Sequence, residues 1–489
     1  MASDTDCRAF GPLDHIAPHN IPQSVMYLNL KQGIKAADAF AYLQEGLRRT
    51  LLQVPWLSGT VHWQCQETPG WRPGQLEIRY GKSTTAPPDQ LRFKELDTPK
   101  SYADLRDAGF LLDAFDDEDI IWTRPWNPDF DKGVPVFAAQ ANFLPGGCIL
   151  AFSISSPASD GTAMLMVIKL WADHCSSRMK TPDGGAVKVL PSESFDRSIL
   201  DQTLVNERGS PSRGLAENET TRQLIGLHLE QIGLHPGTNQ VPDSCPAGGH
   251  NVMKHVIFYM PHRAYTALRK ECVDKFGNID ITGNDLICAL IWRSLMRARA
   301  VTKAGAEDNV AAPVAELLRP FDARPNFAQL LQTMYLGNLN FENRTTMPLD
   351  TLVSQDTSIS SVAQAIRTGA DSQAAQENLL DAYALLRSAP DYNRVQWRAT
   401  HATAASVGIL SPIVLPFNDT CFGEDIFGNG GKPDAFRPIM GACNRGFRTC
   451  FVIPRKKHGG LEFVMTLSEE EMDFLCEDDE FGRYAFPFK

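Results

Sequence analysis

The sequence predicts a mixed α/β protein built from two domains. Its 489 residues are too many for one small core and suit two domains of about 200 residues each. Segments with strand periodicity and helix periodicity follow one another without a strict strand–helix–strand rhythm, which favours mixed sheets and helices in layers. A turn-rich stretch divides the chain. We therefore expect an N-terminal domain over residues 1–180, a crossover linker over 181–250 and a C-terminal domain over 251–489.

The N-terminal half opens with an irregular arm that leads into a short strand, over residues 11–30. One face of the following helix is marked by apolar residues at helical spacing, namely Ala36, Phe40, Leu43, Leu47 and Leu51. Pro55 ends this helix, and a strand follows it. Residues 135–142 and 148–155 are predicted to form a strand pair around a Pro-Gly-Gly turn. A second amphipathic helix starts at Gly161.

The middle of the chain changes character between residues 181 and 250. Pro, Gly and polar residues predominate there, with only short apolar pieces between them. This composition favours a crossover between the two halves. A long disordered surface loop is the alternative.

The second half begins with a predicted strand over residues 255–260 and a helix over 262–276. Thr282 and Asp285 then have the spacing of a capping box at the start of a long helix. A Gly-Gly pair at 459–460 predicts a hairpin, and an acidic helix begins at Ser468.

The composition argues against several classes of function. The net charge is −11 and the pI is about 5.5. A negatively charged protein surface repels the phosphate backbone of nucleic acids and is not attracted to anionic membranes. No secretory signal and no run of about 18 apolar residues is visible. The 11 cysteines, an odd number without CxxC pairs, suit a reducing cytosol, and no zinc-type spacing or phosphate-binding loop occurs. We expect a cytoplasmic monomer that acts on a small molecule, without a metal, a nucleic-acid partner or a membrane partner.

One loop places polar side chains between an apolar strand and a helix start. It is the stretch SISSPASDGTAML, residues 153–165. Ser156 stands four residues before the pair Asp160-Gly161. This loop is our candidate for the site of chemistry.

Several segments follow one another along the chain: GPLDHI near the start, VPWLSGTV, ITGNDLICALIWR, FDARPNF…YLGNLN, LPFNDTCFG, and the closing pieces GGKPDAFRP and GGLEFVMTL. In this order they resemble the BAHD acyltransferase family, in particular its fungal trichothecene-acetyltransferase-like branch. The resemblance covers nearly the whole chain. It implies two chloramphenicol-acetyltransferase-like domains with a channel between them. An acyl-CoA donor and an alcohol or amine acceptor enter that channel from opposite sides.

The resemblance also implies roles for particular residues. The family's motif is HxxxDG, in which the histidine is the general base and the aspartate pairs with an arginine. Here it implies that Asp160 and Gly161 shape the loop and that Arg324 is the partner of Asp160. The segments expected to line the channel contribute Tyr335, Asn338 and Ser411.

This chain departs from the family pattern at two important positions. Ser156 occupies the place of the histidine, and Cys421 occupies that of the first aspartate in the supporting DFGWG motif, ahead of Gly423. An alternative register would place Asp425 there instead. A serine hydroxyl exchanges hydrogen bonds but does not titrate near neutral pH. Loss of a general base typically removes about 10²- to 10⁴-fold in rate.

Several roles stay open for these residues. Ser156 is either a small residue that enlarges the pocket or a nucleophile, although no adjacent base is evident. Asp160 has a structural role when it is paired, and becomes the nearest general base if the pair loosens. His401 lies just before a channel-lining segment and is a candidate substitute base.

Three functions follow from this pattern. The first is a repurposed enzyme of fungal natural-product metabolism. It would bind a small apolar intermediate and promote cyclisation, condensation or cycloaddition through proximity and orientation, with no cofactor and no acyl-CoA. The second is acyl-CoA-dependent O- or N-acyl transfer that uses another base. The third is a non-catalytic binding protein.

Overall fold

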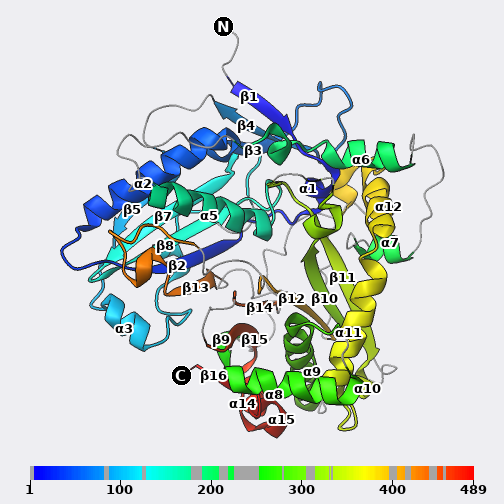
Figure 1. Ribbon diagram of the computed structural model, residues 1–489. Helices are drawn as coiled ribbons and strands as arrows, with labels where there is room; N and C mark the ends of the chain where they lie inside the picture. The colour runs from blue at the N-terminus through cyan, green and yellow to red at the C-terminus, as the bar shows by residue number, and fades with distance from the viewer. Residues whose placement is uncertain are drawn as a thin grey trace.

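The computed structural model describes most of the chain, and all statements below concern the residues it describes. These are residues 5–81, 88–123, 128–177, 190–208, 219–224, 253–277, 280–303, 314–329, 331, 334–395, 405–413, 420–439, 449–454 and 459–488. They form three sheets flanked by helices (Figure 1), which confirms the predicted mixed α/β class.

A five-stranded mixed sheet organises the N-terminal half. Its spatial order is β13 (Ala435–Ile439), β2 (Gln23–Asn29), β8 (Gly147–Ile154), β7 (Phe137–Leu144) and β5 (Leu91–Glu95). Both faces are buried, because Met26 and Leu28 enter one hydrophobic cluster while Val25 and Tyr27 enter another. The helices α2 (Ala36–Gln53) and α5 (Gly161–Ser177) cover the first face, and α3 (Tyr102–Asp107) and α4 (Asp117–Ile120) the second.

Close packing between α2 and α5 explains part of the N-terminal sequence. A side chain at Gly46 would place its Cβ 2.2 Å from Sγ of Cys175, so only glycine fits there. Trp171 of α5 donates its indole N–H to the carbonyl of Leu43 at 2.8 Å. The predicted helix is confirmed, and the 3-10 turn η1 (Pro55–Ser58) follows it. The predicted strand pair is also confirmed, as the antiparallel hairpin of β7 and β8.

A small antiparallel sheet lies above the first one in Figure 1. Its order is β1 (Thr5–Ala9), β4 (Leu76–Gly81), β3 (Thr60–Trp63) and β6 (Val134–Pro135). The opening segment is more regular than the irregular arm we expected. It contains the short helix α1 (Pro12–Ile16), in which Asp14 accepts the N–H of Gly11 at 2.8 Å. A helix of five residues is too short to give a periodic signal.

A seven-stranded mixed sheet forms the centre of the second half. Its order is β11 (Asn340–Pro348), β10 (Val314–Asp322), β12 (Ser406–Leu410), β14 (Cys450–Val452), β15 (Leu461–Leu467), β9 (Lys254–Met260) and β16 (Phe486–Pro487). The helices that share its core are α8 (His262–Phe276), α9 (Gly283–Lys303), α11 (Ile359–Gln373) and α14 (Glu469–Glu477). Both predicted caps are present: Asp285 accepts the N–H and hydroxyl of Thr282, and Ser468 accepts the N–H of Glu471.

A third group of helices joins the two halves near the top of Figure 1. It consists of α1, α6 (Ile199–Arg208), α7 (Glu219–Leu224) and α12 (Gln376–Arg387), which share one apolar cluster. Residues 181–250 were expected to form a crossover linker, and the described part of them contributes two of these helices. The remaining short helices are α10 (Leu349–Val353) and α15 (Asp479–Gly482).

The strand β13 crosses the division that we expected near residue 250. Although it belongs to the C-terminal part of the chain, it pairs with β2 of the N-terminal sheet, with Arg437 opposite Val25. Arg437 is buried and binds Glu462 of β15 at 2.7 Å, so it ties the two larger sheets together. The other two nitrogen atoms of its guanidinium group, Nη2 and Nε, donate to the carbonyls of Gly109 and Phe110.

None of the described helices combines the length and apolar composition needed to cross a bilayer.

Removal of the Arg437 guanidinium tests this connection. The variant Arg437→Ala removes the guanidinium that faces the buried carboxylate of Glu462, so we expect the free energy of unfolding to fall by about 3–5 kcal/mol. The control Arg106→Ala, at a guanidinium that is about half exposed, should change it by less than about 0.5 kcal/mol. Urea denaturation followed by circular dichroism measures both. Equal effects of the two variants would contradict the proposed tie.

Candidate active site

The candidate loop connects β8 to α5 and is fixed by the start of that helix. The backbone carbonyl of Asp160 accepts the N–H of Met164 at 2.8 Å, and its side chain accepts the N–H of Ala163 at 2.9 Å. These two contacts are those of a helix N-cap, which explains why an aspartate precedes Gly161. Gly161 itself is exposed, at the first position of the helix.

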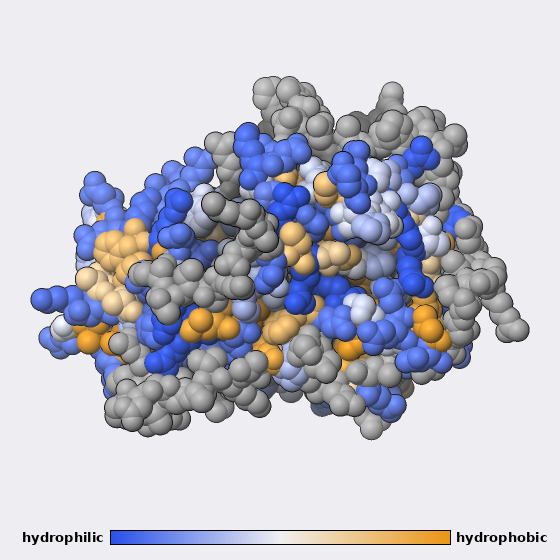
Figure 2. Space-filling model, turned by 90° about the horizontal axis from the view of Figure 1, so that it is seen from above, coloured by the Kyte–Doolittle hydropathy of each residue, from blue (hydrophilic) through white to orange (hydrophobic). Residues whose placement is uncertain are grey.

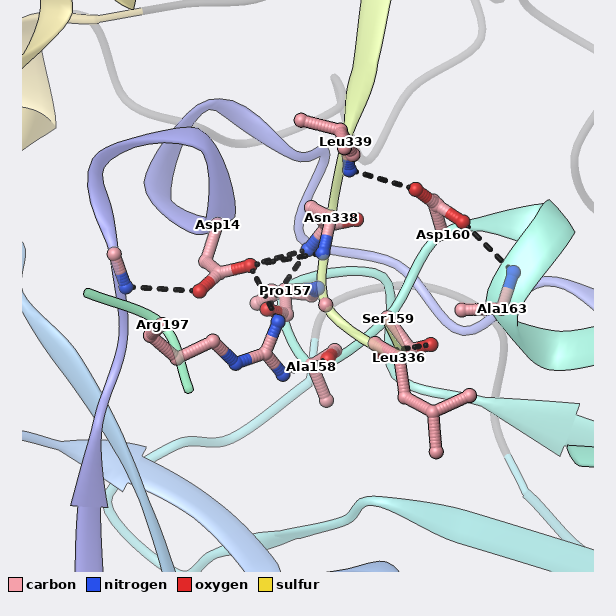
Figure 3. Close-up of polar contacts among 12 residues, drawn as sticks. Asp14, Pro157, Ala158, Ser159, Asp160, Ala163, Arg197, Leu336, Asn338 and Leu339 are labelled. Atoms are coloured by element: carbon pink, nitrogen blue, oxygen red, sulfur yellow. Dashed lines mark hydrogen bonds and ion pairs between the residues drawn. The ribbon is translucent and has the colours of Figure 1, made fainter. Parts of the chain in front are cut away.

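The second half of the chain completes the shell around Asp160. Arg324 Nη2 lies 3.1 Å from both carboxylate oxygens. The N–H of Leu339 donates to Oδ2 at 2.8 Å (Figure 3). The expected pairing of Asp160 with Arg324 is therefore present. Because both oxygens already accept hydrogen bonds from fixed donors, the geometry suits a structural carboxylate better than a general base.

Arg324 is held in place by three further acceptors. It begins the 3-10 turn η4 (Arg324–Phe327) and donates to Asp322 at 2.7 Å. It also donates to the carbonyls of Tyr335 at 3.0 Å and Gly337 at 2.7 Å. A guanidinium with this many fixed partners positions the loop rigidly.

Ser156 is bound to a residue that the sequence analysis did not single out. Its hydroxyl donates to Oδ1 of Asn20 at 2.5 Å, and its backbone N–H donates to the carbonyl of Asn20 at 3.0 Å. No histidine or carboxylate of the described chain makes a hydrogen bond to the Ser156 hydroxyl. The contacts therefore give the serine no activating base.

Asn338 connects the loop to the N-terminal helix α1. Its side-chain amide donates to Asp14 at 2.9 Å and to the carbonyls of Ser156 and Pro157 at 3.0 and 3.1 Å. Asn338 and Tyr335 are both buried. Burial raises the pKa of Tyr335 to about 12. Their expected role in lining a channel stays a prediction.

Asp14 and Arg197 form a second buried ion pair beside the loop. Arg197 Nη1 lies 3.1 Å from Asp14 Oδ1, and Nη2 donates to the carbonyl of Ala158 at 2.5 Å. Asp14 entered the sequence prediction only as part of the GPLDHI resemblance, and Arg197 was not predicted as a site residue. Its position within a turn-rich segment gave no signal of burial.

Two histidines near the loop are held neutral. His15 accepts the N–H of Leu76 at Nε2 and faces the carbonyl of Gly11 at Nδ1, and burial lowers its pKa to about 3. His19 precedes the Ser156 partner Asn20 and lies among Trp63 and Phe130; burial lowers its pKa to about 4. Neither histidine was proposed as a base from the sequence.

The other predicted residues lie apart from this network. Ser411 donates to Asn284 at 2.6 Å, at the start of α9. Cys421 donates its thiol to the carbonyl of Gly430 at 3.2 Å. Gly423 has φ +114° and approaches Tyr42 so closely that a Cβ would lie 2.3 Å from the phenol oxygen. His401 lies outside the described residues.

The family can now be named. The Transferase family matches residues 118–482, and a trichothecene 3-O-acetyltransferase-like N-terminal domain matches residues 22–175. The chain belongs to this family, the BAHD acyltransferases.

Three curated relatives from fungi align with nearly the whole chain. The isocyanide synthase-NRPS hybrid crmA of Aspergillus fumigatus is 28% identical over 96% of this chain and 31% of its own length. The enoyl-CoA isomerase/hydratase claC of Penicillium crustosum is 25% identical over 96% of this chain and 50% of its own length. The chain thus spans half or less of these two relatives. The acyltransferase BOA11 of Botryotinia fuckeliana is 26% identical over 97% of both chains.

A solved structure shares the fold at low identity. TRI101 of F. graminearum, crystallised with coenzyme A and deoxynivalenol, superposes with a TM-score of 0.76 at 19% identity, over 99% of this chain and 100% of that one. This likeness shows the mixed α/β fold alone and leaves the chemistry of this chain to its own residues.

Loss of the Arg324 guanidinium tests the ion pair that holds the loop. Arg324→Ala leaves the buried Asp160 with only backbone donors, so we expect a loss of about 3–5 kcal/mol in the free energy of unfolding. Arg483→Ala, at an exposed ion pair with Glu271, is the control and should cost at most about 1 kcal/mol. Both values come from urea titrations. If Arg324→Ala costs no more than the control, the pair does not stabilise the loop.

Titration of His15 should make stability depend on pH. Its pKa in the folded protein lies below the ordinary value of about 6.5, so the unfolded chain binds a proton first as the pH falls. The contribution of the neutral, buried His15 to the free energy of unfolding is therefore complete above pH 6.5. It is lost towards lower pH, at up to about 1.4 kcal/mol per pH unit. In His15→Gln this slope should be shallower between pH 7 and 5.

The exposed His262 provides the matched control for this slope. Urea denaturation of His262→Gln at pH 7, 6 and 5 should follow the unmodified protein. If His15→Gln keeps the full slope, the acid sensitivity arises at other groups.

Proposed function

We propose that this protein is an enzyme of fungal specialised metabolism in which the BAHD scaffold binds a small apolar intermediate. It promotes a cyclisation, condensation or cycloaddition in the channel expected of the family, without acyl-CoA. One observation carries the proposal: Asp160 keeps its buried partner Arg324, while Ser156, which stands where the resemblance implies the base, is bonded to Asn20.

The support for this proposal comes from separating two contributions to catalysis. A positioned general base is worth about 10²- to 10⁴-fold in rate. Orientation of bound reactants contributes independently, by up to about 7–11 kcal/mol in the most favourable cases. A loop fixed by Asp160 and Asn338 retains the second contribution and lacks the first. This arrangement therefore favours reactions that depend on the orientation of the bound reactants and not on removal of a proton by a general base.

Acyl transfer with another base is the second candidate function. It is supported by the relatives whose names describe acyltransferases, and by His19, which adjoins the Ser156 partner Asn20. A neutral imidazole can accept a proton, but the pKa of about 4 makes His19 a weak base near neutral pH. His401 stays a second proposed base for this candidate. Acyl-CoA would then be a required substrate.

The decisive experiment compares products with and without the acyl donor. Purified protein is incubated with a metabolite extract from the source organism lacking this gene, with acetyl-CoA present or absent, and products are followed by mass spectrometry. We expect a product that forms equally in both cases and has the mass of its precursor or of a condensed pair. A product that forms only with acetyl-CoA and gains an acetyl group would establish the second candidate instead. A ligand that raises the melting temperature without any product would indicate a binding protein.

Restoring the histidine tests whether only the base is missing. In Ser156→His, release of free thiol from acetyl-CoA with a panel of small alcohols and amines should rise by about 10²- to 10⁴-fold over the unmodified protein. Ser156→Ala is the control, because it removes the hydroxyl without adding a base, and it should stay at the unmodified level. A fall in the activity of Ser156→Ala towards any substrate that the unmodified protein acylates would show that the serine itself takes part.

A further inference from the structure

A pocket of about 410 Å³ lies beside the candidate loop, on the far side of Arg197. Its walls come from β1, the turn at residues 70–75, the segment before α6, and the end of α12. None of the loop residues 153–161 lines it. Figure 2 looks down on the end of the molecule where β1 and α6 lie, and there the surface is largely hydrophilic with small apolar groups between.

The charged groups that line the pocket are mostly positive. Four arginines and two aspartates line it, namely Arg8, Arg72, Arg197, Arg387, Asp196 and Asp201. Asp201 is bound by Arg387 at 2.8 Å and by the phenol of Tyr383 at 3.0 Å. Asp196 accepts the N–H and hydroxyl of Ser198 at 2.9 and 2.7 Å. Asp201 is therefore paired with Arg387, and Arg197 is neutralised from behind by Asp14. Asp196 is bound by neutral groups and keeps its negative charge, so the positive groups of the pocket still outnumber the negative ones.

Among the described residues, Arg8 and Arg72 are the two pocket cations that have no carboxylate partner. Arg8 donates to the carbonyl of Phe195, and Arg72 donates to the carbonyls of Arg387 and Ala389 at 2.5 and 2.9 Å. Within the described chain, neither guanidinium has a carboxylate at ion-pair distance. Neutral carbonyls fix the orientation of a guanidinium but leave its charge available to a ligand.

Aromatic rings support both guanidiniums. Cζ of Arg8 lies 5.6 Å from the ring centre of Phe195, and Cζ of Arg72 lies 5.9 Å from that of Tyr392. Burial raises the pKa of Tyr392, so its phenol carries no compensating charge near neutral pH. Phe10 adds a further apolar wall. Two oriented guanidiniums beside aromatic walls suit an anion attached to an apolar body.

We propose that this pocket binds the carboxylate of a small organic acid with an aromatic or alkyl body, held by Arg8 and Arg72. The proposal goes beyond the function proposed above and does not depend on the chemistry at Ser156. Arg197 connects the two sites, because it lines the pocket and donates to the carbonyl of Ala158 in the loop. A ligand anchored here would lie against the residue that supports the loop.

Binding of 3-phenylpropionate, measured by saturation-transfer NMR and isothermal calorimetry, tests the proposal. We expect saturable binding that weakens with salt, and binding of the neutral 3-phenylpropionamide that is at least about tenfold weaker. Arg8→Gln and Arg72→Gln should each weaken binding of the acid by about tenfold or more, with little effect on the amide. The exposed Arg106→Gln is the control and should bind like the unmodified protein.

Several outcomes would overturn the proposal. These are equal binding of acid and amide, unchanged binding in both pocket variants, or no saturable binding of the acid. Inorganic phosphate that binds as tightly as the acid would show a phosphate site without need of an apolar body. Displacement of the acid by coenzyme A would assign the pocket to that molecule. Melting curves establish that each variant is folded, and Arg72→Lys, which keeps the charge, should bind more tightly than Arg72→Gln.

Discussion

The buried ion pair between Asp160 and Arg324 is the constraint on which the candidate site depends. An ionised carboxylate is costly to bury unless charge and hydrogen bonds compensate for the lost water. Here Arg324, the N–H of Leu339 and the N–H of Ala163 supply that compensation. Because these donors come from both halves of the chain, the loop acquires its shape only when the halves are assembled.

A second buried carboxylate reinforces the same constraint. Asp14 accepts the backbone N–H of Asn338 at 3.3 Å, and Asp160 accepts that of the next residue, Leu339, at 2.8 Å. Two adjacent peptide groups thus hold α1 and the loop together. Arg197 completes the arrangement from the segment before α6. Polar networks of this kind are stabilising when every member has a partner.

This arrangement separates the shape of the loop from its chemistry. The contacts of the loop through Asp160, Asn338 and Arg197 do not require an imidazole at position 156. Ser156 instead completes the polar contacts locally, through Asn20. The residue at position 156 can therefore change without loss of the contacts that Asp160, Asn338 and Arg197 make.

By itself, the sequence determined the elements whose signals are local. The apolar face of α2, the hairpin of β7 and β8, and the caps at Thr282 and Ser468 each depend on residues within a few positions of one another. The order of family segments also placed the loop at the candidate site and pointed to Arg324. Tertiary structure alone decided the pairing of β13 with β2, the contact of Ser156 with Asn20, the burial of Arg197 and the arginine pocket. These features join residues more than a hundred positions apart, and no periodicity or local propensity records which distant groups will neutralise one another.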